Sequence, residues 1–239
     1  MINYLFNNIL KFFDYFHKEK IIKKLRTINK KNRFKIVFDV GGHRGESIDL
    51  FLKNFKIDYL YSFEPSKESF KILFKKANLL KNKFDKVNIQ LENLALGDSN
   101  KNVEFNYLKE TSSSTIQKLN TNSSYFKKKE KYLGKLINKK IFIEQVNFQE
   151  YLMNKKINKI DLLKIDTEGY ELEVLRGLKD SLSRVSVILF EHHYHNMILK
   201  NYTFSDIHHL LEKYSFIRVY KSKMPFRKTF EYIYKNKND

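Results

Sequence analysis

A chain of 239 residues with 42% hydrophobic residues, among them 21 Phe and 15 Tyr, is long enough for one α/β domain and short for two. It has no cysteine, which excludes disulfides, cysteine-ligated zinc and thiol catalysis, and no apolar run of about 18 residues, so we expect a cytoplasmic protein without a membrane-spanning helix. The net charge of +19 comes mostly from lysines spread between Lys11 and Lys237, which favours a solvated lysine-rich surface over a specific nucleic-acid site.

Residues 1–33 are expected to form a helical extension ahead of a folded domain over residues 34–239. Apolar residues recur there at roughly helical spacing among Lys and Asn: Leu5, Ile9, Phe12, Phe13, Phe16, Ile21, Ile22 and Leu25. Such a stripe packs on the adjoining domain in most proteins. Because it is basic and rich in aromatic residues, it could instead make a weak contact with a membrane surface.

From residue 34 onward, short apolar segments alternate with helical patterns. We expect strands at 35–40, 59–65, 87–97, 160–166 and 186–193, and helices at 47–55, 66–79, 169–178 and 203–213. Further strands are expected at 102–108 and 141–148, with a terminal antiparallel pair at 216–220 and 230–235. The irregular stretch 109–140 is expected to be a mobile loop or lid. Uniformly apolar strands between helices predict a parallel sheet with helices on both faces, where ligands bind beyond the carboxyl ends of the strands.

The first strand ends in the turn DVGGHRG (39–45), whose glycines would let the backbone approach a ligand closely. Glu46 stands where the third glycine of a dinucleotide fingerprint would fall, so an NAD site is a poor match. Asp39 precedes the first glycine by two residues and could take up a ligand's ammonium group, directly or through water. S-adenosylmethionine carries an ammonium group, so we assign to its binding Asp39, Gly41, Gly42, His43 and Gly45.

The second strand ends at Glu64, 25 residues after Asp39, and Pro65 follows it. In Rossmann-type sites a carboxylate at this point accepts two ribose hydroxyls. A glutamate that merely complements a helix N-terminus is the alternative. Beside the glycine turn the ribose interpretation is the stronger one, and we assign Glu64 and Pro65 to cofactor binding as well.

Four motifs, DVGGHRGESIDLF, FEPSKESF, NLALGD and LLKIDTEGYELEVLRG, resemble those of the FkbM family of methyltransferases in order and separation, over roughly residues 36–192. The resemblance implies a class I fold, a Rossmann-like, doubly wound, mostly parallel seven-stranded sheet with helices on both faces. It also implies S-adenosylmethionine as methyl donor, with hydroxyls of sugars or secondary metabolites as typical acceptors. The turn departs from the family pattern D-V-G-A-N-x-G, because Gly42 and His43 replace Ala and Asn.

The same resemblance implies that Asp166 and Glu168 face the reacting centre and that Ala95 lies beside the adenine. Ser112, Ser113 and Ser114 lie in a segment that also resembles the family. They would line the acceptor pocket or belong to a solvated loop, and both alternatives stay open.

Residues 191–195, Glu-His-His-Tyr-His, end the next strand and offer a base for an acceptor hydroxyl, which must lose its proton as the methyl arrives. His192 is our first choice for this base and His193 our second. Because neighbours on a strand point to opposite faces, only one of the two can face the substrate. A metal site made of Asp166 and histidines and a purely structural role for these residues are the alternatives, and we assign no metal ligand.

These residues predict S-adenosylmethionine-dependent methylation, most simply O-methylation of a hydroxyl on a small-molecule or glycan acceptor. One rival is an NAD- or nucleotide-sugar-binding Rossmann enzyme, which the glycine spacing disfavours. The other is a basic protein that binds nucleic acid or a membrane surface, which would leave the ordered strand-end carboxylates without a purpose. We expect no specific nucleic-acid partner, and the sequence sets neither the acceptor nor an oligomeric state.

Overall fold

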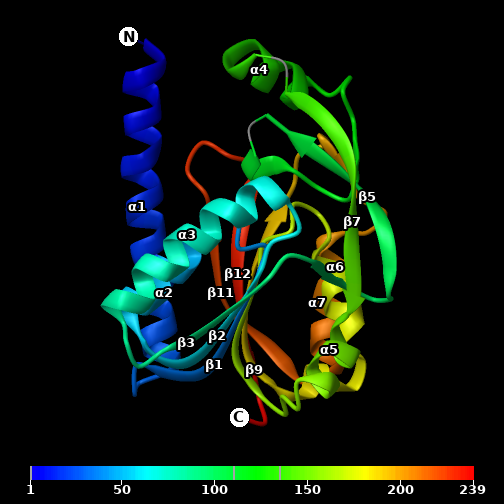
Figure 1. Ribbon diagram of the computed structural model, residues 1–239. Coiled ribbons are helices and arrows are strands. Elements are labelled where there is room, and N and C mark those ends of the chain that lie inside the picture. Colours follow the sequence, from blue (N-terminus) through cyan, green and yellow to red (C-terminus); the bar gives the residue numbers. More distant parts are fainter. Residues whose placement is uncertain (1, 110, 135) are drawn as a thin grey trace.

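The computed structural model describes residues 2–109, 111–134 and 136–239, and its centre is a seven-stranded sheet (Figure 1). The strand order is β11-β12-β9-β8-β1-β2-β3. The strands are β1 (Arg33–Val40), β2 (Lys56–Phe63), β3 (Asn88–Glu92), β8 (Ile160–Ile165), β9 (Val185–His193), β11 (Phe216–Lys223) and β12 (Thr229–Asn236). In this described sheet β12 runs opposite to the other six strands, so its pairings with β11 and β9 are antiparallel and the remaining pairings are parallel. The predicted mostly parallel, Rossmann-like, seven-stranded sheet is confirmed.

Helices cover both faces of the sheet, as predicted (Figure 1). One face carries α1 (Ile2–Ile28), α2 (Glu46–Asn54) and α3 (Lys67–Lys83), and the other carries α5 (Phe148–Asn154), α6 (Glu171–Leu178) and α7 (Phe204–Lys213). A short 3-10 helix, η2 (Lys179–Arg184), joins α6 to β9. Because alternate strand residues point to opposite sides, Val37 joins the core under α1–α3 and Phe38 joins the core under α5–α7.

Local signals in the sequence explain where the helices begin. Ser66 caps α3 by accepting a hydrogen bond from the backbone of Ser69. Thr203 and Asp206 form a capping box at the start of α7, which lies within the helix expected at 203–213. These caps fix the ends of helices whose apolar stripes face the sheet.

The carboxyl-terminal half of α1 is part of the domain core. Ile21, Ile22 and Leu25 are fully buried against the sheet with α2 and α3. Nearer the N-terminus, His17 bonds Glu231 on β12 at 2.5 Å. The prediction that the N-terminal helix packs on the domain therefore holds for this half. The side chains of residues 1–11 are outside the part of the chain that the structure describes. No helix in the described part of the chain is long and apolar enough to cross a membrane.

A three-stranded sheet beside the main one contains β4 (Ala95–Gly97), β5 (Lys101–Leu108) and β7 (Ile137–Asn147). We expected over 87–97 a strand that runs into a turn; β3 ends at Glu92 and a bend follows it, but the return of the chain as β4 in a different sheet was not predicted. The extended strand conformation is interrupted at Asn93. Its side chain donates hydrogen bonds to the backbone carbonyls of Glu64 at 2.8 Å and Pro65 at 3.1 Å. This polar contact ends β3 and turns the chain into the second sheet.

The stretch 109–140 has more regular structure than predicted. It contains η1 (Thr111–Ser113), β6 (Lys118–Leu119), which pairs with β10 (Ile198–Leu199), and α4 (Ser124–Leu133) before β7 begins. Ser123 caps α4, and Phe126 buries itself against Met197 and Ile198. The sequence analysis did not predict this helix, because the segment is rich in lysine and its apolar stripe is narrow. The helix α4 lies above the carboxyl ends of the parallel strands (Figure 1).

Candidate active site

A cavity of about 1290 Å³ lies beyond the carboxyl ends of the parallel strands. Ligand pockets commonly measure about 300–1000 Å³, so this cavity has room for two small molecules side by side. The predicted site residues that line it are Gly41, Gly42, His43, Glu64, Pro65, Ala95, Asp166, Glu168 and His193. Asp39, Gly45 and His192 do not belong to its described lining.

The glycine turn after β1 packs tightly against the end of β8. Gly41 has φ +88°, and a Cβ atom there would lie 1.9 Å from the carbonyl oxygen of Asp166. The backbone N–H groups of Gly41 and Gly42 both donate to the carbonyl of Phe63, at 3.0 and 2.9 Å. Position 41 therefore needs glycine for its backbone conformation and for the close approach of β8.

Glu64 is held at the end of β2 by two backbone donors. Its Oε2 accepts from the N–H of His43 at 2.9 Å, and its Oε1 accepts from the N–H of Ser66 at 2.8 Å. The residue is 6% exposed, and burial raises the pKa of its carboxyl to about 7 against these hydrogen bonds. Each oxygen keeps a lone pair, so the carboxylate can accept from two hydroxyls in the cavity.

Asp39 lies beneath the cavity floor. Strand register places it between Ser62 on β2 and Lys164 on β8. Its carboxylate accepts from Ser47 at 2.7 Å and Ser62 at 3.1 Å, and lies 3.2 Å from Lys164 Nζ. Because Asp39 is fully buried among these partners, the structure does not support direct contact with a ligand's ammonium. The carboxylate instead holds the start of α2 and Lys164 in position.

Lys164 is a site residue that the sequence analysis did not single out. Its Nζ lies 3.2 Å from Asp39 and 3.3 Å from Asp166 Oδ2. Burial alone would lower the pKa of Lys164, but the charges of Asp39 and Asp166 outweigh burial and raise it. The available signal was a lysine within IDLLKID, a predicted strand of the buried parallel sheet, where a buried charge needs a partner.

Glu168 reaches the cavity from a constrained turn after β8. Its φ of +52° is unusual for a residue other than glycine and costs on the order of 1–3 kcal/mol. Thr115 donates to its carbonyl at 2.6 Å. The buried Glu171 carboxylate accepts from the N–H of Gly169 at 2.9 Å and from the hydroxyl of Tyr202 at 2.5 Å. These bonds hold the turn that carries Glu168.

The two histidines at the end of β9 point to opposite faces. Glu191 and His193 line the cavity, whereas His192 packs against Tyr194 and Phe204 behind the sheet. Burial and the nearby Lys200 lower the pKa of His192 to about 3. His192, our first choice for the base, therefore does not line the cavity, and strand alternation places His193 there instead.

His193, Glu168 and Glu191 form a buried cluster at the cavity wall. His193 Nδ1 lies 3.0 Å from Thr229 Oγ1, and Nε2 lies 3.1 Å from Glu168 and 3.4 Å from Glu191. Burial alone would lower the pKa of His193, but the two carboxylates outweigh burial and raise it to about 10. Burial and the charge of Asp166 raise the pKa of Glu191 well above its ordinary value.

The three side chains of this cluster could also hold a metal ion, because their ligand atoms all lie within 4.8 Å of one another. The sequence analysis placed the alternative metal site at Asp166 and the histidines, and the structure groups a different set. Glu191 was visible at the end of β9, but only the fold brings it beside Glu168.

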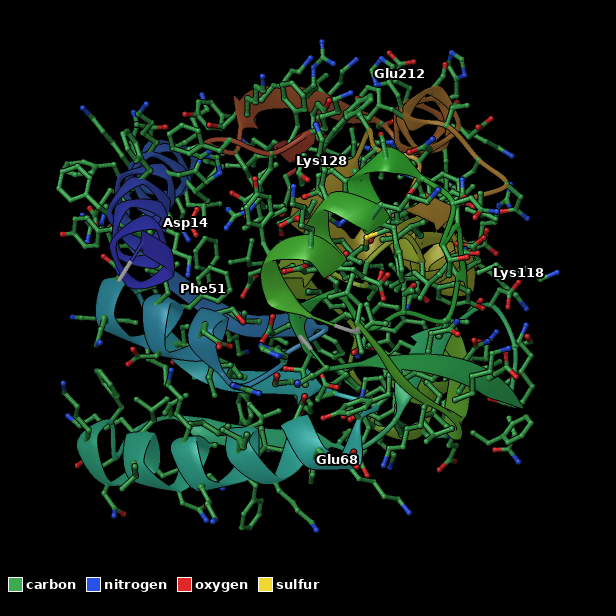
Figure 2. The ribbon with its side chains drawn as sticks, turned by 90° about the horizontal axis from the view of Figure 1, so that it is seen from above. Asp14, Phe51, Glu68, Lys118, Lys128 and Glu212 are labelled. Atoms are coloured by element: carbon green, nitrogen blue, oxygen red, sulfur yellow. The ribbon has the colours of Figure 1, made fainter. Side chains whose placement is uncertain are left out.

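The other lining residues of the cavity are of two kinds. Leu94, Ala95 and Leu96 give an apolar edge near Glu64. A second group is polar or aromatic: Ser112, Ser113, Ser114, Tyr125, Lys128, Tyr132 and Phe226. Seen from above, α4 with Lys128 crosses the middle of the molecule, and α1 with Asp14 lies to one side (Figure 2).

Comparisons with known proteins agree with this geometry. The methyltransferase FkbM domain family matches residues 39–218. The chain is similar to methyltransferase FkbM from Methylobacillus flagellatus at 12% identity and a TM-score of 0.56, over 84% of this chain and 43% of that one. It is also similar to magnesium protoporphyrin IX methyltransferase from Synechocystis with bound SAM, at 10% identity and a TM-score of 0.52, over 94% and 79% of the two chains.

The same Synechocystis enzyme with bound SAH gives 8% identity and a TM-score of 0.53, over 95% of this chain and 84% of that one. Identities this low indicate a shared fold and no more. The chain spans less than half the length of the M. flagellatus protein. No curated protein matches it.

Proposed function

Because the chain belongs to the FkbM family of methyltransferases, we propose that it transfers a methyl group from S-adenosylmethionine to a hydroxyl on a sugar, glycan or secondary metabolite. One observation carries this proposal. Glu64, fixed by two backbone N–H groups at the end of β2, presents its carboxylate to the cavity beside the glycine turn. A ribose diol is the ligand that such a carboxylate suits.

The donor would occupy the half of the cavity between the glycine turn and β4. The backbone at Gly41 and Gly42 would hold its amino-acid end, Glu64 its ribose and Ala95 one face of its adenine. Asp39 supports this half from below through Ser47 and has no direct contact in this proposal. When bound, S-adenosylmethionine supplies an electrophilic methyl group, whose carbon–sulfur bond breaks with its electrons left on sulfur.

The acceptor would occupy the part of the cavity that polar and aromatic side chains line. Aromatic rings such as Tyr132 and Phe226 suit the faces of sugars, and Ser114 and Lys128 offer polar contacts. The carboxylates of Glu168 and Glu191 would orient the acceptor hydroxyl.

Asp166 would take the hydroxyl proton. Its side chain is 33% exposed and lines the cavity, so the proton can pass on to water.

A chain without cysteine suits a reducing compartment, and we propose the cytoplasm as its location.

The first experiment compares donor binding with the rival cofactor. S-adenosylhomocysteine should raise the melting temperature and give a binding isotherm, and NAD should do neither. Transfer of a labelled methyl group to a panel of glycans and small hydroxylated molecules then identifies the acceptor. If NAD stabilises the protein and S-adenosylhomocysteine does not, the proposal fails.

The second experiment concerns Asp166. Asp166→Asn should keep the affinity for S-adenosylhomocysteine and lower methyl transfer by about 10²–10⁴-fold, the usual contribution of a general base. Full turnover in this variant would remove Asp166 from the chemistry.

A further inference from the structure

We propose that Glu168, Glu191 and His193 bind a divalent cation of the Mn²⁺ type at the acceptor end of the cavity. The catalytic part of this inference rests on the proposed function, whereas cation binding can be measured on its own. The three residues come from a turn after β8 and from the end of β9, so the fold assembles a site that is scattered in the sequence.

The spacing of the three side chains suits one ion. His193 Nε2 lies 3.1 Å from Glu168 Oε2 and 3.4 Å from Glu191 Oε1. Neighbouring ligands of an octahedral ion with bonds of about 2.1 Å lie about 3 Å apart. The cluster therefore needs only small side-chain adjustments to place all three atoms around a single cation.

The orientation of His193 gives an independent indication. The residue is 5% exposed, and its Nδ1 is engaged by Thr229 Oγ1 at 3.0 Å. Its buried Nε2 has no hydrogen-bond partner of suitable geometry among the described side chains and is directed at the two carboxylates. Metal-ligating histidines are held in this way, with one ring nitrogen bonded to a supporting group and the other free for the ion.

The charges around the cluster also call for a cation. Glu168 and Glu191 have side chains that are each only 13% exposed. Glu231 lies opposite Glu191 in the register of β12, and Asp166 lines the same cavity. Lys164 already lies between Asp39 and Asp166, and the other buried cation in contact with the cluster is His193 when it is protonated, whose proton a bound metal ion would displace. A divalent ion would compensate carboxylates that are otherwise expensive to bury together.

The ligand set indicates which ion is bound. Two carboxylates with one imidazole suit Mn²⁺ better than Mg²⁺, which prefers oxygen ligands alone. Three protein ligands leave positions open toward the cavity, where an acceptor hydroxyl can bind.

The cation would lower the pKa of that hydroxyl. The hydroxyl oxygen bonds to the methyl carbon as the carbon–sulfur bond breaks with its electrons left on sulfur, and its proton passes to Asp166. Glu168, Glu191 and His193 then act as ligands and exchange no proton.

Titration of the metal-free protein with Mn²⁺, followed by the loss of the free-ion electron paramagnetic resonance signal, tests the site directly. We expect one ion per chain. His193→Ala and Glu191→Gln should each weaken binding at least about tenfold, and Thr229→Val, which removes the support of Nδ1, should weaken it about 10–100-fold. His192→Phe changes the neighbouring side chain on the opposite face and should bind Mn²⁺ like the wild type.

Several results would overturn the inference. The cation site is ruled out if wild-type protein binds no Mn²⁺ below millimolar concentration, or if the cluster variants bind as tightly as wild type. The catalytic part of the inference is ruled out if a chelator leaves methyl transfer unaffected. In the last case, S-adenosylhomocysteine binding and turnover would still support the proposed function. Stoichiometric Mn²⁺ binding that the cluster variants lose would support the site even if S-adenosylhomocysteine failed to bind.

Discussion

At the scale of single residues, Glu64 connects donor binding to pH. Burial raises the pKa of this carboxyl to about 7, whereas a ribose diol needs the ionised form as acceptor. We expect the affinity for S-adenosylhomocysteine to be constant above about pH 7.5 and to fall toward tenfold per unit below about pH 6.5, with proton release on binding. Calorimetry in buffers of different ionisation enthalpy measures both effects.

The matched variants for this prediction are Glu64→Gln and Glu68→Gln. Glu64→Gln should weaken donor binding and abolish its pH dependence, because an amide does not titrate and can offer an N–H where an acceptor is needed. Glu68 lies on the exposed side of α3 with Lys139, and its variant should behave like wild type. A wild-type affinity that does not change with pH would contradict the role of Glu64.

Alanine substitutions at Gly41 and Gly134 distinguish the cost of backbone strain from the cost of a steric clash. Both have positive φ, +88° and +80°, but a Cβ at Gly41 would meet the Asp166 carbonyl at 1.9 Å, and nothing lies within 4 Å of one at Gly134. Gly134→Ala should cost about 1–3 kcal/mol of unfolding free energy from conformation alone. Gly41→Ala should cost about 4 kcal/mol or more and remove donor binding. Urea denaturation measures the unfolding free energies and calorimetry measures donor binding. Equal losses of stability in the two variants would show that the structure around Gly41 shifts to accommodate the added Cβ atom.

At the scale of elements, β9 divides its residues between two environments. His193→Phe should abolish methyl transfer, because its side chain lines the cavity. His192→Phe should retain at least about half of the wild-type rate, because it places an aromatic ring among aromatic neighbours behind the sheet. Steady-state rates of the two proteins, with donor affinity as control, check this prediction. Loss of activity in His192→Phe alone would reverse the assignment.

The helix α1 contributes to stability through its buried second half. Leu25→Ala should lower the unfolding free energy by about 2–4 kcal/mol, since Leu25 is fully buried against the sheet. Lys23 is exposed on the same helix, and Lys23→Ala should change that energy by about 0.5 kcal/mol or less. Chemical denaturation distinguishes the two variants. If Leu25→Ala changed the unfolding free energy by as little as Lys23→Ala, α1 would not contribute to the stability of the domain core.

At the scale of the whole molecule, the sheet and its helices could be predicted because the buried strands are short apolar runs between strong helix signals. Glu64 could be expected at the cavity because it follows directly on β2, whose carboxyl end lies at the cavity. Asp39 also ends a strand, but its side chain lies under the floor, and only the register with Ser62 and Lys164 reveals this. The position of a residue along a strand can be read from sequence more reliably than the side to which it points.

The contents of 109–140 were beyond prediction for a related reason. Its helix is held by Phe126 against Met197 and Ile198, contacts far away in the sequence. Thr115 likewise holds the Glu168 turn from this segment, and the pairing of Glu168 with Glu191 depends on the order of β8 and β9. Contacts of this kind exist only after the chain has folded.

The two-faced arrangement of β9 also limits how this chain can change over evolutionary time. Removal or addition of one codon within the strand would shift every following side chain to the opposite face. Glu191 and His193 would then enter an aromatic interior, and His192 would enter the cavity. Homologous genes should therefore tolerate length changes in the connections around this strand and almost none within it.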